Sequence, residues 1–130
     1  MNPLPNPSGP KRHVLVIDDE ASVRTVLMRQ LTMLGYANTL AESGEAGLQI
    51  LEGGLVPDLV LLDVTMPGTD GLVTLRQLHE KFEHLRVIML AASTDIPKAT
   101  MALNCGASDF MTKPMDLSTL KRTLQIHLPK

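Results

Sequence analysis

The chain has 130 residues, of which 44% are hydrophobic and 20% are charged, and its formal net charge is −2. This composition is ordinary for one globular domain, and the small charge offers no electrostatic attraction to nucleic acid or to an anionic membrane. No apolar run reaches the roughly 18 residues that a membrane-spanning helix needs. The single cysteine excludes an intrachain disulfide and fits a reducing compartment, so we expect a cytoplasmic protein.

Residues 1–10 contain four prolines among Asn, Ser and Gly, which cannot form a helix or a central strand. We therefore expect a disordered tail over residues 1–12 and one folded domain over residues 13–128. Cys105 lies among small residues, and we expect it to pack inside the domain. The histidines are scattered without the spacing of metal ligands, so we interpret them as surface residues. They are His13, His79, His84 and His127.

From residue 14 onward, short apolar runs alternate with segments of helical periodicity. The predicted elements, in chain order, are a strand at 14–17, a helix at 21–34, a strand at 36–40, a helix at 45–51, a strand at 59–62, a helix at 72–82, a strand at 87–90, a helix at 95–104, a strand at 108–111 and a helix at 117–128. Five strands alternating with five helices predict an α/β fold of three layers, with a parallel sheet covered by helices on both faces.

Two of the apolar strands end in acidic residues. Asp18 and Asp19 follow the first strand, and Asp63 follows the third. Because ligands of such sheets bind outside the carboxyl ends of the strands, we expect these side chains to meet there. Carboxylates that lie close together repel, and Mg²⁺ relieves this by binding carboxylates, water and phosphate oxygens. The alternative is that Asp18 or Asp19 caps the helix that follows.

Lys113 follows the fifth strand at the same edge, where its ammonium group could neutralise a phosphoryl group. The alternatives are an ordinary solvated loop lysine and, for the bond to Pro114, a cis peptide. The loop at residues 64–71 is rich in turn formers, and we expect it to place the main-chain carbonyl of Thr65 near a metal. These features predict that the carboxylate of Asp63 accepts a phosphoryl group.

Three motifs, at residues 16–20, 61–71 and 106–114, resemble the receiver domain of two-component response regulators in order and spacing. The resemblance covers residues 13–128. It implies a flavodoxin-like (CheY-like) fold with strand order 2-1-3-4-5. It implies that Asp63 is phosphorylated by a histidine kinase or a histidine phosphotransfer protein.

The same resemblance implies a site and a mode of action. Mg²⁺, which Mn²⁺ can replace, would be held by Asp18, Asp19, Asp63 and the Thr65 carbonyl, and Lys113 would contact the phosphoryl group. The chain would be a phosphoacceptor signalling domain, and no enzyme beyond assisting its own phosphorylation and dephosphorylation. Homodimers or other partners are expected at residues 95–128.

One position departs from the family. The family usually has Thr or Ser at the end of the fourth strand, where this chain has Ala91, which lacks a hydroxyl group. Phe110 fills the switch aromatic position, and Thr65 and Ser93 are the neighbours expected to modulate the reaction rates. We hypothesise that phosphorylation of Asp63 is retained while its coupling to the output face is weakened or rerouted.

Other functions stay open at this point. A receiver-like interaction module that works without phosphate is favoured by Ala91. An aspartyl-nucleophile phosphatase would need a second Asp where Thr65 stands, and a flavin-binding protein would need a phosphate-cradling loop that the sequence lacks. The 130 residues contain no DNA-binding or catalytic effector domain, so a complete single-domain regulator and a fragment of a longer protein are both open.

Overall fold

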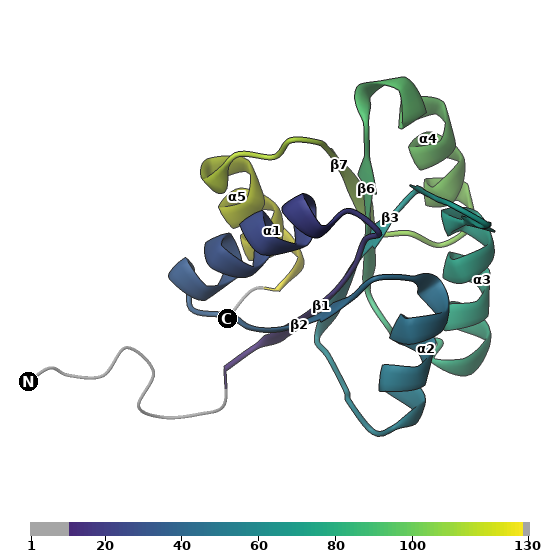
Figure 1. Cartoon of the computed structure of the whole chain (residues 1–130), viewed down its shortest axis with the longest axis horizontal. Coiled ribbons are helices and arrows are strands. Elements are labelled where there is room, and N and C mark those ends of the chain that lie inside the picture. The colour runs from purple at the N-terminus through teal and green to yellow at the C-terminus, as the bar shows by residue number, and fades with distance from the viewer. Residues whose placement is uncertain (1–10, 129–130) are drawn as a thin grey trace, which may run out of the picture.

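The computed structural model describes residues 11–128, which form one parallel sheet between two layers of helices (Figure 1). The tail predicted at residues 1–12 lies mostly outside the described residues. The sheet consists of β1 (His13–Ile17), β2 (Ala37–Ala41), β3 (Leu59–Asp63), β6 (Val87–Ala91) and β7 (Asp109–Thr112). The helices are α1 (Ala21–Met33), α2 (Gly44–Glu52), α3 (Gly71–Lys81), α4 (Ile96–Asn104) and α5 (Leu117–His127).

The strand order is β2-β1-β3-β6-β7 with every pair parallel, which confirms the order 2-1-3-4-5. In this register Ile17 pairs with Leu62, and Asp63 pairs with Leu90. The carboxyl ends of the three central strands therefore stop at nearly the same level. The order of the strands reverses beside β1, so the edge where β1 and β3 end is the place where such folds bind ligands.

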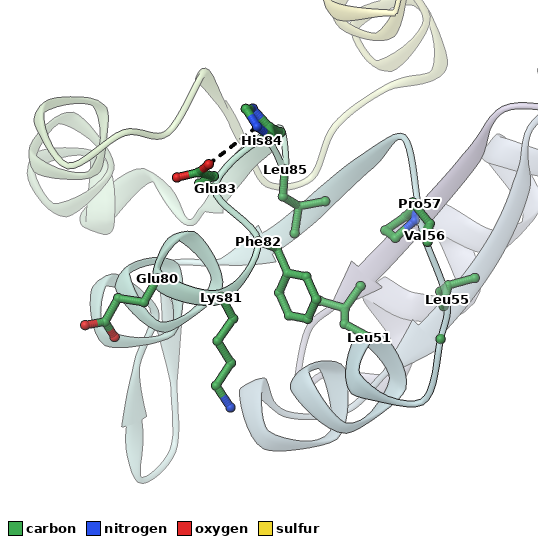
Figure 2. A pocket seen from close by; sticks show the side chains of 11 residues that line it. Leu51, Leu55, Val56, Pro57, Glu80, Lys81, Phe82, Glu83, His84 and Leu85 are labelled. Carbon is green, nitrogen blue, oxygen red and sulfur yellow. Dashed lines mark ion pairs between the residues drawn. The ribbon is translucent and has the colours of Figure 1, made fainter.

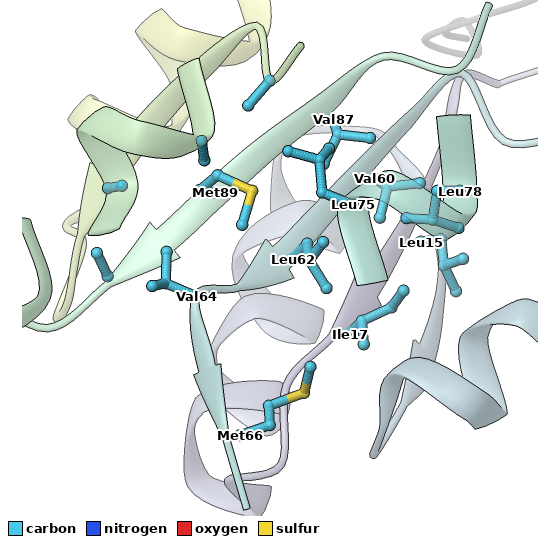
Figure 3. Close-up of a cluster of buried hydrophobic side chains, with 14 of the residues drawn as sticks. Leu15, Ile17, Val60, Leu62, Val64, Met66, Leu75, Leu78, Val87 and Met89 are labelled. Carbon is cyan, nitrogen blue, oxygen red and sulfur yellow. The ribbon is translucent and has the colours of Figure 1, made fainter. Parts of the chain in front are cut away.

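Alternating side chains of each central strand enter two separate cores. Val14 and Val16 pack with α1 and α5 on one face, whereas Leu15 and Ile17 pack on the other face, toward α2, α3 and α4. Figure 3 shows this second core, in which Leu75 of α3 lies among side chains of the central strands. Full burial of a Leu or Ile side chain stabilises by about 1.5–3 kcal/mol, so these continuous apolar strands hold the carboxyl edge in place.

The loop after β3, predicted as a connection rich in turn formers, is more regular than its composition indicates. It forms a small antiparallel hairpin of β4 (Thr65–Met66) and β5 (Thr69–Asp70). Gly68 adopts a φ of 75° after Pro67, and this combination closes a two-residue turn. The hairpin ends directly in α3, whose first residues are capped by Asp70 through its Oδ1, 2.9 Å from the N of Leu72.

Other sequence expectations shift by small amounts. β2 and β7 each begin one residue later than predicted, and α4 begins at Ile96 after a short 3-10 turn, η1 (Ser93–Asp95). Cys105 is exposed, so the expectation that it packs inside is wrong: it caps the end of α4, where the chain turns toward Gly106. The small residues beside Cys105 indicated close packing, but they lie where the chain turns after α4. No helix among the described residues is long and apolar enough to span a membrane.

The histidines were expected at the surface, and His84 is exposed. The other three are partly buried, and each has a polar partner. His13 contacts the hydroxyl of Thr39, His79 contacts the carbonyl of Leu85, and His127 contacts Asp109. These partners come from neighbouring elements in the fold, so the linear sequence did not reveal them. The histidines lie away from the acidic edge and form no site together.

Candidate functional site

Two buried carboxylates lie side by side at the carboxyl edge of the sheet. Asp18 follows β1 and is fully buried, and Asp63 ends β3 with 3% of its surface exposed. Asp18 is fixed through its N, which donates to the carbonyl of Ala41, and through Oδ1, which accepts from the N of Glu20 at 2.9 Å. The N of Thr65 donates to Asp63 Oδ1 at 3.2 Å. Main-chain contacts therefore hold both carboxylates rigidly.

Lys113 reaches this pair from the end of β7. Its own N donates to the carbonyl of Ala91 at 2.8 Å, and the peptide bond that follows it, to Pro114, is cis. The Nζ of Lys113 lies 2.8 Å from Asp18 Oδ2, 3.1 Å from Asp63 Oδ2 and 3.2 Å from Glu20 Oε1. Its side chain is only 12% exposed. Lys113 is therefore part of the buried site and is not a solvated loop lysine.

Burial and neighbouring charges at this edge give both Asp63 and Lys113 a raised pKa. Burial, and then the charge of Asp18, raise the pKa of Asp63 from 3.8 to about 7, although Lys113 pulls it down. Burial alone would lower the pKa of Lys113, but Asp18 and Asp63 raise it above its usual range. Lys113 is therefore cationic at neutral pH, while Asp63 sits at a carboxylate-rich edge that favours an additional cation.

The helix-cap interpretation of the acids does not hold. The N-cap of α1 is Glu20, and its side chain makes no capping hydrogen bond. Instead, Arg24 from the first turn of α1 donates from Nη1 to the carbonyl of Asp18 at 2.7 Å. The carboxylates of Asp18 and Glu20 both turn toward Lys113. The beginning of α1 is therefore tied to the site by its main chain and by Arg24.

The donor atoms of this edge fit a hard divalent cation. One oxygen each of Asp18, Glu20 and Asp63 lies within 4.8 Å of the others. Asp18 Oδ2 is buried without an aligned hydrogen-bond donor among the described residues, although Lys113 lies 2.8 Å away. Clustered carboxylate oxygens are the ligands that Mg²⁺ takes up in proteins. Asp19 is partly buried and does not belong to this closest group.

Glu20 was not among the predicted site residues. The sequence showed three adjacent acids, Asp18 to Glu20, but gave no sign of which would face Lys113, because that depends on where α1 begins. Since Glu20 is the N-cap, its side chain lies beside the end of β7, within reach of Lys113. The structure adds Glu20 to the predicted acid–lysine set.

The Thr65 carbonyl has a defined place in the hairpin. Thr65 pairs with Asp70, and the flanking N of Gly71 donates to the carbonyl of Val64 at 2.8 Å. In an antiparallel ladder this pattern makes Thr65 and Asp70 a pair that exchanges no hydrogen bonds. The Thr65 carbonyl is therefore not consumed by Asp70. Gly71 is needed here because a Cβ atom would collide with the carbonyl oxygens of Asp63 and Val64.

The predicted switch positions lie next to the site. Ala91 ends β6 fully buried and pairs with Thr112, and its side chain is a methyl group without a hydroxyl. Phe110 is partly buried against the core that contains α3 and α4. Ser93 and Thr65 are exposed. Of the predicted switch and rate-modulating positions, Ser93 and Thr65 carry a side-chain hydroxyl, whereas Ala91 and Phe110 do not.

Two hollows mark the described surface. One, of about 360 Å³, adjoins the acidic edge between α1 and the chain after β7, and both Glu20 and Lys113 line it. The other, of about 520 Å³, lies at the opposite edge of the sheet, where Phe82 and Leu51 point toward one another (Figure 2). Its charged rim includes the Glu83–His84 ion pair and Lys81, which pairs with Glu52, but among the described residues no group of three acids that could hold a metal lies there. The reactive groups therefore belong to the first hollow.

Comparisons with known proteins agree with this site. The model of the response regulator receiver domain family matches residues 14–125. The uncharacterized transcriptional regulatory protein YkoG of Bacillus subtilis (strain 168) is 40% identical over 111 residues, which cover 85% of this chain and 48% of that protein. The DNA-binding transcriptional regulator NtrC of Klebsiella pneumoniae is 40% identical over 102 residues, covering 78% and 22%. The crystal structure of the receiver domain of NtrX from Brucella abortus has a TM-score of 0.84 at 29% identity, covering 88% of this chain and 97% of that one.

The chain therefore belongs to the response regulator receiver domain family of two-component systems, whose general function is a phosphorylation-based switch. Receiver domains generally bind Mg²⁺ in an acidic pocket and are phosphorylated by histidine kinases or phosphotransfer proteins. The chain spans about half the length, or less, of the curated relatives named here.

Proposed function

We propose that Asp63 is the phosphoacceptor of this receiver domain. The observation that carries this proposal is the buried carboxylate of Asp63, whose Oδ2 lies 3.1 Å from the ammonium group of Lys113 and beside Asp18. In the reaction, a carboxylate oxygen of Asp63 attacks the phosphorus of a phosphohistidine. The new O–P bond forms as the P–N bond breaks, and the departing imidazole nitrogen keeps the electron pair and takes up a proton.

Lys113 acts on the charge of the transferred group. Its pKa is raised by Asp18 and Asp63, so it carries a full positive charge at neutral pH. It would neutralise phosphoryl oxygens as the group arrives and hold them afterward. Removing Lys113 would leave the acidic edge without its fixed cation.

Mg²⁺ is the cofactor we propose, with Mn²⁺ as a substitute. Asp18, Asp19, Asp63 and the Thr65 carbonyl would hold the ion, which supplies charge neutralisation at the reacting oxygens. The Thr65 carbonyl, which Asp70 does not use, and the buried Asp18 support this ligand set. Because burial and Asp18 raise the pKa of Asp63, a cation at this edge would favour the ionised, nucleophilic form.

The phosphorylated domain acts as a signalling switch and assists only its own phosphorylation and dephosphorylation. The exposed Thr65 and Ser93 would modulate these rates by controlling the access of water. Ala91 supports a switch that is coupled to Phe110 in an atypical way, because Ala91 has no hydroxyl group to donate a hydrogen bond to the phosphoryl oxygens. We place the domain in the cytoplasm with its kinase, and residues 95–128 as a surface for a second copy or another partner.

The phosphoacceptor proposal is tested by labelling with a small phosphodonor. Acetyl phosphate with Mg²⁺ should phosphorylate the parent chain, should fail without the cation, and should not label Asp63→Asn. A parent chain that is never labelled would exclude the phosphoacceptor and favour the second candidate, a phosphate-independent interaction module, for which Ala91 is the supporting observation. Binding of Mg²⁺, followed by titration of protein NMR spectra, separates the same two candidates independently of the donor.

The effect of Ala91 is tested with a phosphoryl mimic. Beryllofluoride and Mg²⁺ should shift the amide resonances around Asp63 and Lys113 strongly and those of β6, β7 and Phe110 only weakly. Large shifts throughout β6 and β7 would argue against weakened coupling.

A further inference from the structure

The ammonium group of Lys113 is surrounded by three carboxylates. Asp18, Asp63 and Glu20 each place an oxygen within 3.2 Å of its Nζ. An ammonium group has three N–H donors, but Asp18 Oδ2 is not aligned with any of those of Lys113. The contact with Glu20 has the geometry of a hydrogen bond. A phosphoryl oxygen that binds Lys113 must therefore compete with Glu20 for this donor.

The three carboxylates differ in how easily they can leave. The side chain of Asp18 is fully buried, and that of Asp63 is 4% exposed, so neither can move into water without dismantling the edge. The side chain of Glu20 is 56% exposed. A surface carboxylate that loses its partner is rehydrated at little cost, whereas a buried one is left uncompensated. Glu20 is therefore the replaceable partner of Lys113.

We propose that Glu20 is a displaceable partner of Lys113, which accepts a hydrogen bond from the lysine before phosphorylation and is expelled when a phosphoryl group arrives on Asp63. The inference rests on the proposed phosphorylation of Asp63 and adds a positioning residue that acts through Lys113. Two anionic groups compete for one donor, so the negative charge that phosphorylation adds drives the exchange. Glu20 also opposes the approach of an anionic phosphodonor.

The displacement of Glu20 would change the surface of the hollow beside the site. Glu20 lines the hollow between α1 and the chain after β7, next to Val23, Val26 and Met115. Before phosphorylation the charge of Glu20 is turned inward onto Lys113, and afterward it stands free at the rim of this largely apolar groove. Because Glu20 is also the N-cap of α1, the change reaches that helix directly. This route does not use Ala91, whose methyl group cannot donate a hydrogen bond to the phosphoryl oxygens.

The first test compares the parent chain with Glu20→Gln and with Glu42→Gln. Gln keeps the size of the side chain and removes its charge, and Glu42 is an exposed acid that follows β2 at the same edge of the sheet. NMR spectra of the Lys113 ammonium group and of the amides of α1 are recorded with and without beryllofluoride and Mg²⁺. In the parent and in Glu42→Gln, the mimic should shift both sets of resonances.

In Glu20→Gln without the mimic, the amides at the beginning of α1 should already be displaced toward their positions in the mimic-bound parent. The further shift on adding beryllofluoride should be less than about half of that in the parent, because one charged partner is already gone. An α1 response of the same size in Glu20→Gln and in the parent would overturn the proposal.

The second test measures phosphorylation by acetyl phosphate at saturating Mg²⁺. Removing one charge near the site should raise kcat/KM in Glu20→Gln by about threefold to fivefold, mainly through a lower KM, and this gain should shrink in high salt. Glu42→Gln should match the parent. Labelling that proceeds equally in all three proteins would overturn the role of Glu20 and leave the phosphoacceptor in place. Failure to label the parent would overturn both.

Discussion

Replacing Asp63 by Asn tests whether the charge at the acidic edge destabilises the folded domain. Burial, and then the charge of Asp18, raise the pKa of Asp63 from 3.8 to about 7. Between these two values the folded domain keeps a proton on Asp63 that the unfolded chain has lost. Because the unfolded state binds fewer protons in this window, the free energy of unfolding falls as the pH rises through it.

The magnitude follows from the same two values. A pKa difference of one corresponds to about 1.4 kcal/mol, so the difference between 3.8 and about 7 corresponds to about 4 kcal/mol over the whole window. Relaxation of the protein and entry of water around the charge reduce this figure. Between about pH 5 and about pH 8, we expect Asp63 to lower the stability of the parent by about 2–3 kcal/mol, and this loss should be absent from Asp63→Asn.

Urea unfolding in EDTA, at several pH values across this range, measures the difference directly. The stability of Asp63→Asn relative to the parent should rise with pH, whereas that of the exposed control Glu42→Gln should change little. Added Mg²⁺ should then restore the parent at high pH, because a ligand that binds the folded state stabilises it. Parallel stability curves for the parent and Asp63→Asn would refute the idea that Asp63 is ionised at a cost.

Three further substitutions test other parts of the site. Gly71→Ala should lower the free energy of unfolding by about 1–3 kcal/mol in urea and slow labelling by acetyl phosphate, because its Cβ would collide with the carbonyl of Val64; unchanged stability would contradict the packing described here. Lys113→Met leaves the buried Asp18 unpaired and should cost about 3–5 kcal/mol without Mg²⁺, with partial recovery when the ion is added to the unfolding experiment. Ala91→Thr adds a hydroxyl group and should increase the beryllofluoride-induced NMR shifts in β7, and equal shifts in both proteins would show that the methyl group does not limit the coupling.

Much of the fold was predictable because the pattern of apolar residues is local. Four-residue apolar runs such as 14–17 and 59–62 are long enough for buried strands, and the leucine spacing between them indicates helices. The hairpin at residues 65–70 was not predicted. Its two strands have only two residues each, so they show no periodicity, and Pro67 and Gly68 are equally typical of a plain turn.

The candidate site was predicted in its residue types but not in its contacts. Asp18, Asp63 and Lys113 were named because each stands at the end of an apolar strand, and parallel strands bring these ends to one edge. Glu20 was missed. Its role depends on the residue at which α1 begins and on the distance to a lysine 93 positions away in the chain, and neither is encoded by local spacing.

The sequence by itself therefore determined which strands form the sheet and which acids and lysine end them, since burial and periodicity are properties of short segments. The tertiary structure decided the burial, the pKa values and the ion-pair partners of these groups. It buried Asp18 completely, raised the pKa of Asp63 to about 7 and left Glu20 as the exposed partner of Lys113. These outcomes depend on distances and solvent access between segments far apart in the chain, because Coulomb energy and desolvation are set by the packed fold.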